Sequence, residues 1–156
     1  MLYEAVVADF ADRTRQNLRA LEELQTQGHR VFEVTQLVNS MLGLLVFPRE
    51  EFVGSIPKIR VAELQAQGWP VPKTRPGFPE VPDLNELVRY LRNAISHFNI
   101  EFIGDGHGQI SVIRVWNNSL SGERTWEADL GVEELRGIAE RFVDLLLDHP
   151  NVGPAA

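Results

Sequence analysis

The chain contains no cysteine, and this absence removes several chemistries at once. Disulfide bridges, thiolate zinc sites and thiol nucleophiles all require that side chain. No apolar run approaches the length of a membrane span, and acids occur too early in the N-terminal stretch MLYEAVVADF for a secretory signal peptide. There is also no internal repeat and no low-complexity tract. We therefore expect a cytoplasmic protein with no membrane contact and no cofactor.

A clustered basic surface is also missing, since the formal net charge is −7. Residues 101–156 hold 10 acids and 4 bases, whereas residues 1–100 hold 12 acids and 11 bases. Tight, sequence-independent binding of a nucleic-acid duplex needs a concentrated basic footprint, so it is disfavoured. Local binding of a short single strand stays open.

What is present is typical of one globular domain: 156 residues, of which 44% are hydrophobic and 24% are charged. We expect this domain to span residues 1–150 and a loose tail to occupy 151–156. Apolar periodicity predicts a first helix over residues 3–27, which Gly28 ends. Residues 48–82 hold most of the prolines and predict an irregular excursion with one short helical patch at 61–67.

The segment 31–47 is apolar almost all round, which is typical of a helix in the middle of a bundle, and Pro48 ends it. Four polar residues interrupt it: Thr35, Gln36, Asn39 and Ser40. Buried polar groups need hydrogen-bond partners. Asn39 is therefore expected to face another helix's backbone, a partner subunit or an active site.

Residues 83–99, with the sequence DLNELVRYLRNAISHFN, form the helix around which the chain is organised. Asp83 is the expected N-cap, with Glu86 three residues on. One stripe of the helix is apolar and predicts core packing: Leu84, Leu87, Val88, Leu91, Ile95 and Phe98. The polar residues Asn93, Ser96 and His97 fall on the opposite side, with Arg92 at the border, so any chemistry belongs on that outer face.

Three β-rich runs follow, separated by the stretch GDGHG and by a turn at 117–122. A last helix, opened by Gly131 or Asp129, runs to Leu147. The predicted fold is mainly α: a helical bundle with a small antiparallel β-meander inserted before the last helix.

The chemistry candidates gather at the end of the central helix. A guanidinium at Arg92 can hold a phosphate, an imidazole at His97 can transfer protons, and Asn93 can orient that imidazole. This set suits phosphodiester chemistry without a metal. The alternative is that Arg92 pairs with an acid and His97 is a solvated histidine at a helix end.

Other polar residues are weaker candidates. Ser96 and Arg89 lie one turn either side of Arg92 and can extend a phosphate site, although Arg89 can equally pair with Glu86 or face solvent. Tyr90 can stack on a base or pack inside the fold. GDGHG offers two potential metal ligands, which are too few, so a glycine-rich turn explains it better and no metal site is expected.

The stretch LRNAISHF resembles the signature of the HEPN superfamily: an arginine, a polar residue, and a histidine four to six positions after the arginine, near the end of a helix in a small bundle. The segment FEVTQLVNSMLGLLVFPRE and the later meander resemble a bacterial branch of HEPN-type nucleases, and the likeness spans residues 30–147.

The resemblance implies a metal-independent endoribonuclease that acts as a homodimer, with its two motifs meeting across a symmetric cleft. Arg92 would stabilise the phosphorane, His97 would be a general acid or base, and Asn93 would orient the site. RNA would be left with 2′,3′-cyclic phosphate and 5′-hydroxyl ends. Toxins of the two-gene nucleotidyltransferase systems carry a tyrosine two residues after the histidine, where this chain has Asn99. Silencing through that tyrosine is therefore not expected.

Two other classes of function stay open. Some HEPN-like modules are catalytically silent and bind a nucleotide, an RNA or a protein partner such as an antitoxin. A structural dimerisation protein would instead show no RNA binding, even at low salt.

Overall fold

The computed structural model describes residues 3–46, 48 and 50–148. The fold is mostly helical with an antiparallel sheet, as predicted from the sequence. The helices are α1 (Tyr3–Thr26), α2 (Glu33–Met41), the π-helix η1 (Leu42–Val46), α3 (Glu50–Ser55), α4 (Val61–Ala66), α5 (Leu84–Ser96) and α6 (Val132–Asp148). The strands are β1 (Lys73–Thr74), β2 (Ile100–Gly104), β3 (Ile110–Asn118) and β4 (Arg124–Gly131). The division into one domain and a tail stays a prediction, and the tail lies outside the described residues.

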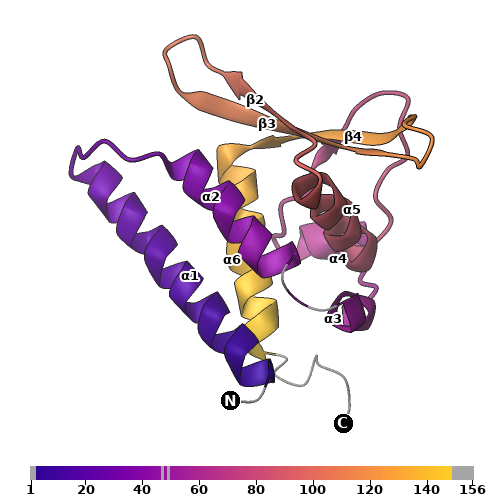
Figure 1. Ribbon diagram of the computed structural model, residues 1–156, viewed down its shortest axis with the longest axis horizontal. Helices are drawn as coiled ribbons and strands as arrows, with labels where there is room; N and C mark the ends of the chain where they lie inside the picture. Colours follow the sequence, from indigo (N-terminus) through magenta and orange to yellow (C-terminus); the bar gives the residue numbers. More distant parts are fainter. Residues whose placement is uncertain (1–2, 47, 49, 149–156) are drawn as a thin grey trace.

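The sheet has the strand order β1-β4-β3-β2, and all neighbouring strands are antiparallel. The sheet lies across one end of the helices, which are all on one side of it (Figure 1). The expected meander is therefore confirmed as β2, β3 and β4. The fourth strand, β1, comes from the proline-rich excursion, which we expected to hold only one short helix. That excursion also contains α3, so its predicted irregularity was overstated.

The second helix differs from the sequence prediction. It begins at Glu33 and is a regular α-helix only to Met41, after which the chain continues as the π-helix η1. Gly43 lies under the ring of Phe10, and a Cβ there would come within 2.4 Å of it. Asn39 and Thr35 are exposed, so the expectation of buried polar groups holds only for Ser40. The sequence pattern wrongly predicted one continuous helix because its apolar residues are divided between an α-helix and a π-helix, which have different numbers of residues per turn.

The central helix begins as predicted. Asp83 is its N-cap, and the carboxylate accepts a hydrogen bond of 2.9 Å from the Glu86 amide. The apolar stripe is buried from Leu84 to Ile95. The prediction that Phe98 packs in the core was wrong. Phe98 lies beyond the end of the helix, with 63% of its surface exposed.

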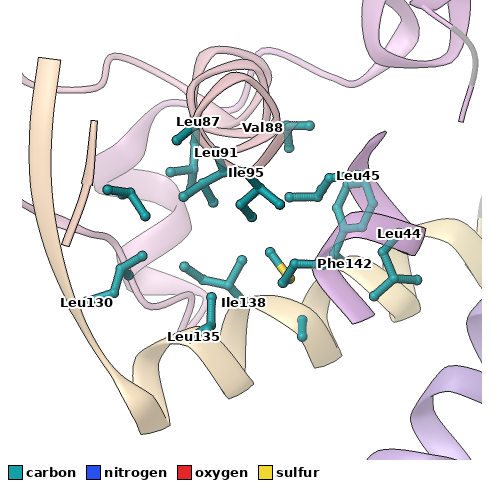
Figure 2. Close-up of a cluster of buried hydrophobic side chains, with 14 of the residues drawn as sticks. Leu44, Leu45, Leu87, Val88, Leu91, Ile95, Leu130, Leu135, Ile138 and Phe142 are labelled. Carbon is teal, nitrogen blue, oxygen red and sulfur yellow. The ribbon is translucent and has the colours of Figure 1, made fainter. Parts of the chain in front are cut away.

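The core lies between α5, α6 and η1. Figure 2 shows Leu91 and Ile95 pointing from α5 toward side chains of α6 and η1. Phe142 of α6 is 1% exposed there. Burial of such apolar surface contributes on the order of 25 cal/mol per Å² and is the main force that holds the bundle together.

A buried amide also fixes α5 against α3. Asn85 is 5% exposed, and its Nδ2 donates to the carbonyl oxygens of Val53 at 2.8 Å and Ile56 at 3.1 Å. These carbonyls belong to the last turn of α3 and the residue after it, where backbone acceptors lack helical partners. This contact orients α5, which carries the candidate site.

The sheet face turned away from the helices carries an ion-pair ladder. Arg114 donates to Asp129 through Nε at 2.7 Å and through Nη2 at 3.2 Å, and Arg75 donates to the same carboxylate at 3.3 Å. The hydrogen bond from Arg114 is the main cause that lowers the pKa of Asp129 below its ordinary value.

This lowered pKa predicts a pH-dependent contribution to stability. A depressed carboxyl pKa stabilises the fold at pH values above the unfolded pKa, about 4, and the contribution is lost as the pH falls through the folded pKa. We expect the Asp129→Asn variant to lose less stability than the native protein between about pH 5 and pH 2. Urea unfolding at a series of pH values measures this. Parallel pH profiles for the two proteins would contradict the prediction.

Candidate functional site

The outward face at the end of α5 carries the predicted polar residues. Asn93, Ser96 and His97 are all exposed, as expected from the helical wheel. The carbonyl oxygen of Asn93 accepts hydrogen bonds from the Ser96 hydroxyl at 3.1 Å and the His97 amide at 3.2 Å. The backbone therefore holds these three residues in one rigid turn.

The helix ends immediately after this turn in an unusual way. The Asn99 amide donates to the Ala94 carbonyl at 2.8 Å and the Phe98 amide to Ile95 at 3.1 Å, which is the hydrogen-bond pattern of a Schellman cap. The left-handed position of that cap is normally glycine, but here Phe98 adopts φ +54°. A non-glycine residue in this conformation costs on the order of 1 kcal/mol. The result is an exposed aromatic ring next to His97.

Arg92 occupies a different side of α5. It is half-buried, and its Nη1 donates to the carbonyl oxygen of Pro48 at 3.2 Å. Five residues separate it from His97, so on an ideal helix the two side chains leave the axis about 140° apart. Asn93 and His97, four residues apart, differ by only about 40°. Within one chain, α5 therefore brings Asn93 and His97 together and directs Arg92 elsewhere.

The remaining predicted binding residues are dispersed. Arg89 is exposed on α5, and Asn39 is exposed on α2. Tyr90 is half-buried and packs with its ring 5.0 Å from that of Trp126, which supports the packing role over base stacking.

A polar hollow lies beside His97, where the turn between β3 and β4 approaches the end of α5. Its volume is about 580 Å³, and we call it the asparagine hollow. It is lined by Asn93, His97, Asn99, Asn117, Asn118, Ser119, Leu120 and Gly122. Arg92, Ser96, Arg89 and Asn39 are not among these lining residues.

Hydrogen bonds attach this turn to α5. The Asn117 side chain is 8% exposed, and its Nδ2 donates to the Tyr90 carbonyl oxygen at 3.2 Å. The Trp116 amide donates to the Asn99 carbonyl oxygen at 3.2 Å. Within the turn, the Gly122 amide donates to the Ser119 carbonyl at 2.9 Å, and Gly122 has φ +86°. These hydrogen bonds fix the far wall of the hollow relative to the end of α5.

Sequence reasoning missed the residues of this wall. Asn117, Asn118 and Ser119 were interpreted only as a turn, although three consecutive small polar side chains are also suited to hydrogen-bonding a ligand. This run of polar side chains was visible in the sequence. The sequence could not predict that the turn lies against the end of α5.

The stretch GDGHG forms the turn between β2 and β3. The Asp105 carboxylate accepts hydrogen bonds from the amides of His107 at 2.7 Å and Gln109 at 3.2 Å, and both Gly106 and Gly108 have positive φ. The turn prediction is confirmed. Within residues 3–46, 48 and 50–148, no group of three or more His, Asp or Glu side chains lies close enough together to hold a metal ion.

Chemically, the exposed turn of α5 offers an imidazole, a group able to transfer protons, beside neutral amides, and the guanidinium of Arg92 lies on a different side of the helix. No helix in the part of the chain that the structure describes is both long and apolar enough to cross a membrane.

Comparison with known proteins identifies the family. The family model described as HEPN pEK499 p136 matches residues 1–152, which is nearly the whole chain. No curated protein and no solved structure gives a match. The HEPN resemblance inferred from LRNAISHF and the flanking segments is confirmed by this match, which does not depend on the motif alone. The chain therefore belongs to the HEPN pEK499 p136 family.

Proposed function

We propose that this protein is a metal-independent endoribonuclease of the HEPN type. The observation that carries the proposal is the outward-facing turn of α5, which presents Asn93 and His97 together on the helix that also carries Arg92, in a chain of the HEPN family. Membership in that family also supports RNA as the partner.

In the proposed reaction, the 2′-hydroxyl of RNA loses its proton to a general base and attacks the adjacent phosphorus. The bond to the 5′-oxygen breaks, and that oxygen receives a proton from a general acid. The products are a 2′,3′-cyclic phosphate and a 5′-hydroxyl. His97 acts as one of these proton-transfer groups, and Arg92 stabilises the extra negative charge of the phosphorane. Asn93 orients the imidazole or the RNA.

A homodimer would resolve the divergence between Arg92 and His97. The two side chains leave α5 about 140° apart, so one copy directs them away from each other. A twofold axis beside the helix end would set Arg92 of one copy near His97 of the other. It would also double the weak local positive charge that Arg92 supplies at this face, in a chain whose excess of acids lies mainly beyond residue 100.

The decisive experiment incubates the purified protein with mixed cellular RNA in EDTA and identifies the fragment ends. We expect fragments with 2′,3′-cyclic phosphate and 5′-hydroxyl ends, and a dimeric mass by light scattering. The Arg92→Ala variant should produce few fragments, whereas Arg13→Ala, which removes an exposed arginine of α1, should cleave normally. Cleavage that requires an added metal would show that the site assignment is wrong.

The main alternative is a catalytically silent HEPN module that binds nucleotide, RNA or a protein partner. The hydrogen bond from Arg92 to Pro48 favours it, because this guanidinium already has a partner within the chain. Intact RNA in the experiment just described, together with measurable RNA binding, would support this alternative. A role as a toxin or defence factor, with a neutralising antitoxin, is compatible with either activity.

A further inference from the structure

We propose that the asparagine hollow binds a nucleobase, and that it holds a base next to the phosphate that is cleaved. The binding of a base does not depend on the proposed ribonuclease function, whereas its position next to the cleaved phosphate rests on that function. The hollow contains His97, so a base bound there would be adjacent to the proton-transfer group.

The chemistry of the lining selects for a neutral, polar ligand. Four of the lining residues are asparagines, and each amide offers both a donor and an acceptor. His97 is the only titratable side chain in the lining, and no lysine or arginine contributes to it. A phosphate group would lack a cation, whereas the edge of a nucleobase presents the paired donors and acceptors that amides recognise.

A buried acceptor in the lining is unsatisfied. Asn117 uses its Nδ2 to donate to Tyr90, but its Oδ1 has no hydrogen-bond partner among the described residues. Leaving a buried acceptor unpaired is costly, and native structures rarely do so without reason. Because this oxygen is buried, a donor from a ligand in the hollow reaches it only after a rotation of the Asn117 side chain.

Two exposed apolar side chains belong to or adjoin the lining: Leu120 lines the hollow, and Phe98 lies in the chain between the lining residues His97 and Asn99 without lining the hollow itself. Phe98 follows His97, is 63% exposed, and is held in a backbone conformation that favours glycine. Leu120, at the tip of the β3–β4 turn, is fully exposed. Single-stranded bases are commonly bound by stacking on an aromatic ring while amides read their edges. A base in the hollow would contact Leu120 and extend toward the exposed ring of Phe98 for stacking, and the asparagines would supply the hydrogen bonds.

The test measures binding of four uncleavable 2′-O-methyl trinucleotides whose central base is A, C, G or U. The methyl group removes the nucleophile, so affinity is read without turnover. We expect the native protein to prefer one base by at least about fivefold, since one good amide–base pair contributes on the order of 1 kcal/mol. The Asn118→Ala variant should lose this preference, and Asn17→Ala, which removes an exposed asparagine of α1, should keep it.

A second variant separates ligand binding from folding. Phe98→Gly relieves the left-handed backbone, so its melting temperature should be unchanged or higher. Its affinity for all four trinucleotides should nevertheless fall several-fold because the stacking surface is gone. Full affinity in both Phe98→Gly and Asn118→Ala would overturn the proposal, as would equal binding of the four bases by the native protein.

The outcome can be distinguished from that of the nuclease proposal. Base preference in a protein that leaves RNA intact would support the hollow and refute the nuclease. Cleavage with no base preference would support the nuclease and refute base binding in the hollow. The same measurement is made with free nucleoside 5′-monophosphates. If the protein binds them as tightly as the trinucleotides, the hollow does not serve a base within RNA.

Discussion

Alanine at His97 is expected to lower the rate of RNA cleavage by about 10²- to 10⁴-fold, the usual contribution of one general acid or base. His97 is exposed at the end of α5, and its backbone amide is held by the Asn93 carbonyl. Removal of the imidazole should therefore leave the fold intact. Single-turnover cleavage of an RNA substrate in EDTA measures the effect, with circular dichroism as the check on folding.

The matched control is His107→Ala. His107 is also exposed, but it lies in the β2–β3 turn, where its backbone amide contacts Asp105. This variant should cleave at the native rate. Equal loss in the two variants, or a native rate for His97→Ala, would show that the imidazole at position 97 takes no part in the reaction.

Truncation of Phe142 to alanine is expected to destabilise the fold by about 3–5 kcal/mol, the cost of removing a buried aromatic side chain and leaving a cavity. Phe142 is 1% exposed, and Figure 2 shows its ring between α6 and η1. In a domain of this size, that loss lowers the melting temperature by about 6–20 °C. Thermal and urea unfolding would measure it.

Phe102→Ala provides the comparison, because that side chain in β2 is 40% exposed and loses less burial when truncated. Its effect should be well under half that of Phe142→Ala. Similar losses for the two phenylalanines would mean that the contact between α6 and η1 does not stabilise the protein in the way described.

Elements with a strong local pattern were predicted correctly. The first helix ends beside Gly28, which has φ +85°, and the central helix begins at its Asp83 cap. In the same way, Glu134 caps the start of α6 by accepting a hydrogen bond of 2.7 Å from the Gly131 amide. These signals act within one or two turns of the chain, so the sequence is sufficient to reveal them.

The errors occurred where distant contacts outweigh local preference. β1 is a strand only because Lys73 and Thr74 pair with Asp129 and Ala128 of β4, more than fifty residues away. Phe98 matched the apolar period of α5, but the helix ends before that position and leaves its ring in solvent.

For the candidate site, the sequence by itself determined which residues share the outer face of α5, because side-chain direction on a helix follows from residue spacing. It thereby placed Asn93 and His97 together with Arg92 at the border of that face, whereas the structure showed Arg92 half-buried and bonded to the Pro48 carbonyl. Only the tertiary structure decided that Asn117 and Asn118 complete a hollow beside His97. The sheet register and the contact of the β3–β4 turn with α5 set that arrangement, and both depend on packing between segments far apart in the chain.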